Sequence, residues 1–364
     1  MAKITEDHVL QALSQVNDPD LGRDLVSLDF VTQLHLDDQA IALTVKLTSA
    51  VSPHAVALEQ SIRAALAPIA GTRTVAVQFA ADPPAGGEKT PNIKYILGVG
   101  AGKGGVGKST VAVNLAVTLA QLGAKVGLLD ADIYGPSVPI MLGLRDYKPA
   151  VNAKRKIEPA QAHGIKAISM GFMVDAQTAV AWRGPMVGRA VTQLVEDVDW
   201  GELDFLIVDL PPGTGDIILS LCQAIPLSGA VVVSTPQDVA FADVLRAVKM
   251  FSMLKVDVVG LVENMAYFRA PDTQKDYEIF GNSAATIQCP QYGIELLGRL
   301  PLDMAVSPNA DAGRPIVAAE KSSNQADLYR TIAARVASRL AVLVDQKTSL
   351  AEVGKDFFGQ RPAQ

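Results

Sequence analysis

The sequence predicts an α/β fold in which a mostly parallel sheet is flanked by helices, with a small α/β domain before it. Three observations carry the prediction. Short apolar runs alternate with helical stretches after residue 94, which is typical of parallel strands covered on both faces. The first run leads through a glycine-rich loop into a helix. The stretch "FAADPPAGGEKTPNIK", residues 79–94, is rich in proline, glycine and charge and separates two differently patterned regions.

The composition of the chain excludes several classes of protein. The 364 residues are 49% hydrophobic and can bury a large core, and the net charge of −6 disfavours a nucleic-acid partner. No apolar run is long enough for a membrane span, and the first residues predict an amphipathic helix and no signal peptide. Two cysteines imply no disulfide framework, and we therefore expect a cytoplasmic protein. From the charge and the lack of a membrane span we expect that it binds neither nucleic acid nor membrane.

The first domain is expected over residues 1–80, followed by a linker over 81–94. Its hydrophobic periodicity predicts the order helix, strand, strand, helix, strand. These elements are expected at residues 5–16, 30–36, 41–48, 54–67 and 74–79. The result is a small α/β unit.

The second domain is expected over residues 95–345, and a C-terminal tail over 346–364. Its short apolar runs predict buried strands. The runs lie at residues 95–99, 125–130, 205–210, 229–235 and 257–264. Near the end of the chain, one apolar stripe at helical spacing predicts a helix before a polar tail. The stripe consists of Leu328, Ile332, Val336 and Leu340.

The loop "GKGGVGKST" between the strand at 95–99 and the next helix has the pattern of a phosphate-binding loop. Its glycines let backbone N–H groups turn toward phosphates, and the start of the helix adds partial positive charge. We expect Lys108 to reach the β- and γ-phosphates of ATP and Ser109 to bind Mg²⁺. The residues expected to contact ATP here are Gly102, Lys103, Gly104, Gly105, Val106, Gly107, Lys108, Ser109 and Thr110.

Aspartates follow two of the predicted strands. Asp209 ends "FLIVD", the place where such a site needs an acid for the Mg²⁺ shell. Asp130 and Asp132 end "KVGLLDAD". Alternate residues of an extended chain point the same way, so both are expected to face the nucleotide. We assign Asp132 to ordering the attacking water and Asp130 to the metal shell; the alternative is that each caps the following turn.

The early lysine of "KGGVGKST" resembles the deviant Walker A motif of the MinD/ParA class of P-loop ATPases. In that class this lysine reaches across a dimer to the partner's nucleotide. The resemblance implies that Lys103 is catalytic across a homodimer and neutralises transition-state charge as an arginine finger does. Dimer formation would then control a slow, switch-like ATP hydrolysis.

Further stretches, among them "DADIYGPSVPIMLG", "DFLIVDLPPGTGDIILSL" and "GLVENMAYF", are similar to the Mrp/ApbC family of iron–sulfur cluster carrier ATPases. The stretches "VNDPDLGRDLVSLDFV" and "LTSAVSPHA" resemble the MIP18-type domain that often precedes this ATPase. The resemblance implies a carrier or scaffold whose partners are apo iron–sulfur client proteins and assembly factors. It also implies that Asn264 recognises adenine and that Pro301 and Asp303 border the base.

The sequence departs from this family at its usual thiols. No cysteine lies between Asn264 and Gly281, where many members carry a Cys-x-x-Cys pair, and Ser52 stands where relatives have cysteine. Cys222, in an apolar helix, is expected to be buried. Cys289 precedes Pro290 and is expected to be more accessible, so it is the preferred ligand if a [4Fe–4S] cluster binds, one from each protomer.

Three functions stay open at this point. The first is an ATP-hydrolysing dimer that carries iron–sulfur clusters. The second is a positioning ATPase of the MinD/ParA type, which would carry a basic patch or a basic amphipathic helix; the mixed-charge end of the chain disfavours it. The third is a nucleotide-gated adaptor without a cluster of its own, which the missing cysteines favour.

Overall fold

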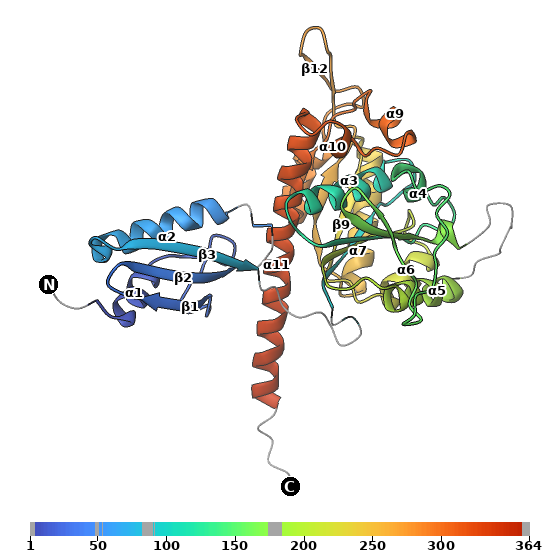
Figure 1. The fold of residues 1–364 in the computed structure, drawn as a ribbon. Helices are drawn as coiled ribbons and strands as arrows, with labels where there is room; N and C mark the ends of the chain where they lie inside the picture. Colours follow the sequence, from blue (N-terminus) through green and yellow to red (C-terminus); the bar gives the residue numbers. More distant parts are fainter. Residues whose placement is uncertain are drawn as a thin grey trace. The chain divides into compact units, whose positions relative to one another are not determined.

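The computed structural model describes residues 4–47, 51–52, 54–81, 90, 92–173 and 184–358 (Figure 1). The chain divides into two compact units. The first comprises Met1–Pro84 and Ala337–Gln364, and the second comprises Ala85–Val336. Most of the predicted linker, 82–89, lies outside the described residues, as do residues 359–364 of the predicted tail.

The first unit contains a three-stranded sheet of order β1-β2-β3. β1 (Val31–Leu36) pairs antiparallel with β2 (Ala40–Leu47), and β2 pairs in parallel with β3 (Thr74–Ala81). A parallel pair needs a crossover connection, and α2 (Ala55–Ala70) provides it; α1 (Glu6–Leu13) precedes the sheet. The observed order of helices and strands is the predicted one.

One face of this small sheet packs against the two helices. Ile41, Leu43 and Val45 of β2 are buried, while the residues between them are partly exposed. This alternation follows from the pleat, which sends successive side chains to opposite faces. The buried residues form one core with Leu13 of α1 and Ile62 of α2.

Within the described residues, the second unit is built around an eight-stranded sheet of order β13-β10-β9-β4-β8-β5-β7-β6. All neighbouring strands are parallel except β6 and β7, which confirms the predicted mostly parallel sheet. The strands are β4 (Ile93–Gly100), β5 (Val126–Asp130), β6 (Ala160–Ala162), β7 (Ile165–Ser169), β8 (Leu203–Asp209), β9 (Gly229–Ser234), β10 (Val258–Glu263) and β13 (Leu296–Arg299).

Helices flank the large sheet (Figure 1). They are α3 (Lys108–Gln121), α4 (Val138–Met141), α5 (Gly184–Asp197), α6 (Asp216–Ala224), α7 (Asp238–Met253), α8 (Ala284–Gln288), α9 (Val306–Asp311), α10 (Ile316–Ala319) and the part of α11 (Asn324–Phe358) up to Val336. A short hairpin of β11 (Phe268–Arg269) and β12 (Asp276–Tyr277) follows β10.

Both faces of the large sheet are buried. Every residue of β8 is buried, and its Leu206 and Val208 share a core with side chains of α5, α6 and α7. Phe205 points to the opposite face, where its ring stacks on Tyr95 with centroids 5.4 Å apart. Burial on both sides explains why these strands read as continuous apolar runs.

The predicted apolar stripe lies in α11. Ile332, Val336 and Leu340 are buried. Ile332 lies so close to β13 that a Cβ on Gly298 would come within 2.6 Å of it. The helix continues to Phe358, through residues that were expected to begin the tail.

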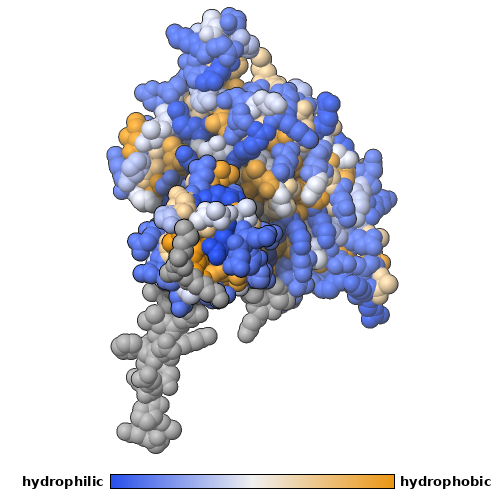
Figure 2. Space-filling model, turned by 60° about the vertical axis from the view of Figure 1, so that its left-hand side comes forward, coloured by the Kyte–Doolittle hydropathy of each residue, from blue (hydrophilic) through white to orange (hydrophobic). Residues whose placement is uncertain are grey.

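The visible surface is mainly polar. On the face drawn in Figure 2, hydrophilic residues cover most of the area and hydrophobic ones gather in small patches. Within the described part of the chain, no helix combines the length and the apolar character that crossing a bilayer requires.

Candidate nucleotide-binding site

The glycine loop joins β4 to α3, as predicted. Gly105 and Gly107 both have a φ of 83°, and Gly107 is the residue that precedes the first turn of α3. This left-handed conformation favours glycine. Gly102 lies against α7, where an added Cβ would approach the backbone oxygen of Asp243 to 2.4 Å. Gly102 therefore cannot carry a side chain without a shift of α7, and Gly105 and Gly107 have a backbone conformation that side chains disfavour.

Lys108 is the centre of the site. Its Nζ lies 2.6 Å from Oδ1 of Asp209 and 3.6 Å from Oδ2 of Asp132. The ammonium also donates to Oγ of Ser109 at 3.2 Å. The fold thus brings four predicted site residues together from β4–α3, β5 and β8.

Asp209 has an oxygen that the protein leaves unsatisfied. The residue is fully buried, and its Oδ2 has no hydrogen-bond partner among the described residues. Burial raises the pKa of Asp209, and the adjacent Lys108 opposes that rise. A buried carboxylate oxygen without a partner calls for a ligand, and with the Ser109 hydroxyl nearby it offers the oxygen donors that magnesium prefers.

Asp130 has different partners from Asp132. Its carboxylate accepts hydrogen bonds from the Asp132 backbone N–H at 3.1 Å, from Ser169 Oγ at 2.9 Å and from the Val138 N–H at 3.3 Å. Burial, with the charge of Asp209, raises the pKa of Asp130 to about 8. These bonds hold the turn that carries Asp132 toward Lys108. They agree with the capping alternative, and a direct place in the metal shell stays a prediction.

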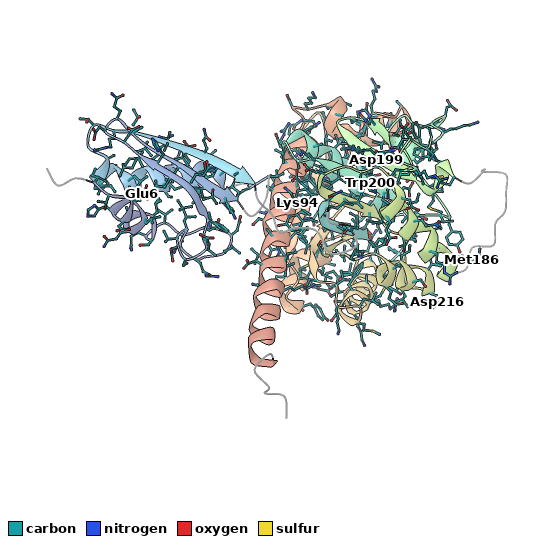
Figure 3. All side chains as sticks on the ribbon, turned by 60° about the horizontal axis from the view of Figure 1, so that its bottom comes forward. Glu6, Lys94, Met186, Asp199, Trp200 and Asp216 are labelled. Atoms are coloured by element: carbon teal, nitrogen blue, oxygen red, sulfur yellow. The ribbon has the colours of Figure 1, made fainter. Side chains whose placement is uncertain are left out.

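The loop after β8 lies against the glycine loop. Gly213, with φ at 94°, donates its N–H to the Ala101 carbonyl at 2.8 Å. α6 begins directly afterwards at Asp216, and Figure 3 draws Asp216 near Met186 of the neighbouring helix α5. Because this hydrogen bond joins the loop after β8 to the glycine loop, a displacement of one loop moves the other.

The residues predicted to border the base lie on two neighbouring segments. Asn264 Nδ2 donates to the Val106 carbonyl of the glycine loop at 2.9 Å. Pro301 accepts a hydrogen bond from Gln325 at its carbonyl, and Asp303 accepts one from the Ala305 N–H. The segments that carry Asn264 and Pro301 follow β10 and β13, which are adjacent in the sheet.

Lys103 differs from Lys108 in its surroundings. It is half-buried, and it makes no hydrogen bond or ion pair with the residues that the structure describes. None of the described residues forms a hydrogen bond or ion pair that fixes the position of its ammonium. An action in its own site or across a dimer is equally compatible with this position.

The expectation that Cys289 is more accessible than Cys222 is wrong, since their exposed fractions are 0% and 5%. Cys289 begins a 3-10 turn (Cys289–Tyr292) after α8, and its side chain is fully buried in the core of the second unit. Pro290 does produce a turn, but the turn directs Cys289 inward. Burial raises the pKa of Cys289 to about 11 and that of Cys222 to about 12. Within the described residues, no three side chains of His, Cys, Asp or Glu lie together so that they could hold a metal ion.

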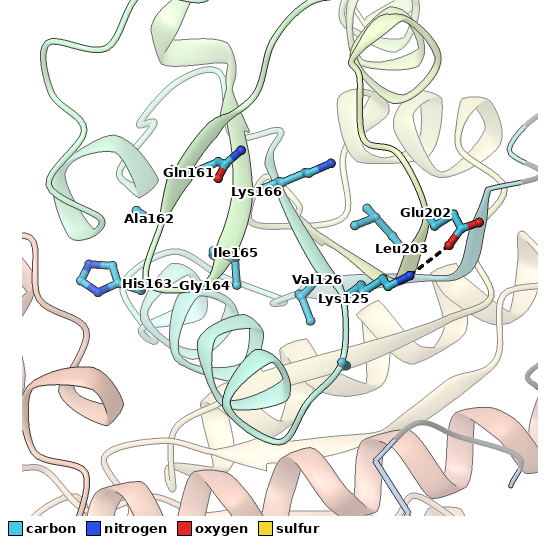
Figure 4. A pocket seen from close by; sticks show the side chains of 11 residues that line it. Lys125, Val126, Gln161, Ala162, His163, Gly164, Ile165, Lys166, Glu202 and Leu203 are labelled. Atoms are coloured by element: carbon cyan, nitrogen blue, oxygen red, sulfur yellow. Dashed lines mark hydrogen bonds and ion pairs between the residues drawn. The ribbon is translucent and has the colours of Figure 1, made fainter. Parts of the chain in front are cut away.

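A separate cavity of about 650 Å³ lies at the other end of the parallel strands (Figure 4). Lys125, Glu202 and Lys166 are among its lining residues, and Lys125 is paired with Glu202 at 3.0 Å. These residues stand at the amino ends of β5, β7 and β8, whereas the glycine loop follows the carboxyl end of β4. The cavity is therefore distinct from the nucleotide site.

Sequence reasoning missed Glu263. This residue ends β10, is fully buried and binds Arg299 and Ser283. An acid that closes an apolar strand, as in "VVGLVE", was the signal that could have found it.

Two families match the chain. Residues 92–337 match the family described as NUBPL iron-transfer P-loop NTPase, and residues 6–79 match the family described as iron-sulfur cluster assembly protein. An iron-sulfur cluster carrier protein of Deinococcus radiodurans is 48% identical over 337 residues, covering 92% of this chain and 96% of that protein. The iron-sulfur cluster transfer protein NUBPL of Dictyostelium discoideum is 47% identical over 252 residues, covering 69% and 78%.

Solved structures agree with the fold. A nucleotide-binding protein of Archaeoglobus fulgidus, in complex with ADP, is 39% identical with a TM-score of 0.58, covering 65% of this chain and 93% of that chain. The cell division ATPase MinD of Pyrococcus furiosus, 22% identical with a TM-score of 0.51, covers 66% of this chain and 98% of its own; it is similar in fold alone. The family match and the 48% identity over most of the chain confirm the predicted resemblance: this chain belongs to the family of iron-transfer P-loop NTPases.

Proposed function

We propose that this protein is a cytoplasmic ATP hydrolase that acts as a homodimer and controls the loading or transfer of iron–sulfur clusters to apoproteins. The observation that carries the proposal is the cluster of Lys108, Asp209 and Asp132 beside the glycine loop. Its context is a chain similar along most of its length to a protein named as a cluster carrier.

The residues divide the work of hydrolysis among them. The loop amides and the start of α3 cradle the phosphates, and Lys108 transfers its ammonium contact from Asp209 to phosphate oxygens. Ser109 and Asp209 would hold magnesium, which when bound supplies positive charge to the phosphates. Asp132, fixed through its own backbone by Asp130, orients the attacking water. Asn264 reads the adenine.

Lys103 completes the site from the partner subunit in this proposal. Its ammonium has no partner within the described chain, which leaves it available to a second copy. Because assembly of the dimer completes the charge at the phosphates, turnover is slow and follows the association of two subunits.

The buried thiols favour a second candidate, a nucleotide-gated adaptor that holds no cluster. Both cysteines are at most 5% exposed. Coordination by Cys289 would require the turn after α8 to open. In this alternative ATP controls the binding of a client and the cluster stays on other proteins.

Anaerobic reconstitution with iron and sulfide tests the two candidates together. A carrier binds iron and sulfide in equal amounts and releases them to an apo-ferredoxin in an ATP-dependent way. An adaptor hydrolyses ATP but binds neither. A Cys222→Ser, Cys289→Ser double variant that binds as much cluster as the wild type excludes ligation by these thiols. Absence of ATP hydrolysis in the wild type would refute both candidates.

A further inference from the structure

Glu263 is a buried carboxylate that the mechanism above does not use. Its Oε2 accepts a hydrogen bond from Arg299 Nε at 2.7 Å, and its Oε1 accepts one from Ser283 Oγ at 2.7 Å. Both oxygens are therefore satisfied although the residue has no exposed surface. A buried ion pair is weak evidence for stability, but it can fix one arrangement of the chain.

The Glu263–Arg299 pair lies at the start of the two segments that are predicted to border the base, one after β10 and one after β13. Glu263 ends β10 and directly precedes Asn264, while Arg299 ends β13 and lies two residues before Pro301. Backbone hydrogen bonds join the segments beyond it: Leu300 to Glu263 at 2.8 Å, Ala266 to Leu300 at 2.8 Å, and Leu302 to Tyr267 at 2.7 Å. The Glu263–Arg299 pair joins the two segments beside the first of these backbone hydrogen bonds.

The glycine loop makes the placement of Asn264 exacting. A Cβ on Gly107 would approach Asn264 Nδ2 to 2.2 Å, and the same amide donates to the Val106 carbonyl. Met265, the next residue, is held at a φ of 54°, which is strained for a residue with a side chain. A small shift of this segment therefore changes the contact with the loop.

Arg299 also contacts a solvent-exposed carboxylate, Glu278, which can be compared with the buried Glu263. Its Nη2 lies 3.2 Å from Glu278, whose side chain is 40% exposed, against 0% for Glu263. The guanidinium also lies 5.9 Å from the Tyr267 ring. Loss of Glu278 removes a solvent-screened pair, whereas loss of the Glu263 charge lets Arg299 turn outward to Glu278 and water.

We propose that Glu263 is a positioning residue for base recognition: through Arg299 it keeps Asn264 in register with Pro301 and Asp303. The inference rests on the proposed ATP function. Contacts to the base are made equally in the bound and the transition state, so their loss raises KM without lowering kcat. Discrimination between ATP and GTP falls with them, because it depends on the same groups.

The test compares Glu263→Gln with Glu278→Gln in steady-state hydrolysis of ATP and of GTP. For Glu263→Gln we expect KM for ATP to rise roughly tenfold with kcat within about twofold, and the preference for ATP over GTP to fall by a similar factor. Glu278→Gln should leave both unchanged. Ser283→Ala removes the hydrogen bond to Glu263 Oε1 together with the cap on α8, but it leaves the pair of Glu263 with Arg299 in place. It should therefore lower thermal stability and leave the ATP preference intact.

The outcomes separate this inference from the proposed function. A folded Glu263→Gln protein with wild-type KM and nucleotide preference overturns the inference and leaves the ATPase standing. Equal losses for ATP and GTP, in kcat as well as KM, show a structural role and also overturn it. Wild-type protein that binds no ATP in equilibrium dialysis refutes the proposed function itself. If Glu263→Gln does not fold, Arg299→Lys, which keeps the charge but loses the planar fork, should show the same KM shift, and a wild-type KM in it counts against the inference.

Discussion

Two lysines five positions apart in one loop have opposite surroundings. Lys108 is buried and contacts two carboxylates, whereas Lys103 is half-buried and has no such contact within the described chain. From the sequence, the two lysines could be told apart only by their positions in known phosphate-binding motifs. The fold adds the physical difference, because Asp132, two residues after β5, and Asp209, the last residue of β8, converge on Lys108 and not on Lys103.

Replacement of Lys108 should abolish productive binding. We expect Lys108→Ala to weaken ATP affinity by a factor of roughly 10 to 100, since each hydrogen bond to a charged group contributes about 1.5–3 kcal/mol. The aspartates left unpaired would also repel the phosphates. Isothermal titration with ATP measures the change, and Lys103→Ala serves as the matched control with near-wild-type affinity. Wild-type turnover in Lys108→Ala would refute the assignment.

The two thiols should resist modification in the folded protein. Their raised pKa values, about 11 for Cys289 and about 12 for Cys222, keep both protonated at pH 8, and only the thiolate reacts. Reactivity should rise only as the pH approaches those values. Alkylation with iodoacetamide at pH 8, followed by mass spectrometry, should label neither cysteine in native protein and both in denaturant. Rapid native labelling of Cys289 would restore it as a candidate ligand.

At the scale of elements, the loop between β4 and α3 depends on glycines for different reasons. Gly107 has a left-handed backbone and lies against Asn264, while a Cβ on Gly104 would meet nothing within 4 Å. The glycine pattern in the sequence does not reveal this difference. It appears only when β10 brings Asn264 beside the loop.

This difference predicts unequal effects of alanine on folding. Gly107→Ala should destabilise the protein by about 1–3 kcal/mol, the usual range for a side chain forced into a strained backbone. Gly104→Ala should change stability by less than about 0.5 kcal/mol. Urea denaturation of the two variants gives the comparison. Equal stability would show that the loop adapts to the new side chain.

The elements themselves were largely predictable. Strands such as β8 are continuous apolar runs because both sheet faces are covered, and the loop residues lie together in the sequence. The Glu263–Arg299 pair was not predictable, since its members are 36 positions apart and meet only because β10 and β13 are neighbours. Cys289 was misjudged because a turn signal does not tell which residue of the turn faces the core.

At the scale of the whole molecule, the proposed homodimer makes a test by mixing possible. Lys103→Ala and Asp132→Ala should each be nearly inactive as pure proteins. If Lys103 acts in trans, a mixed dimer contains one site with neither defect, so mixing at equal amounts should restore a measurable part of wild-type hydrolysis. Activity is assayed by phosphate release, with dimer exchange verified by fluorescence transfer. Mixed dimers without recovered activity would contradict action across the interface.

The contact between Lys108 and Asp209 has a thermodynamic consequence. A triphosphate that draws the ammonium away also frees the carboxylate, whose other oxygen already lacks a partner. A cation that engages the carboxylate in turn releases the ammonium. Each event removes an obstacle to the other, so nucleotide and magnesium should bind with positive, reciprocal cooperativity. The internal ion pair thereby makes the protein respond to the metal–nucleotide complex more strongly than to either component alone.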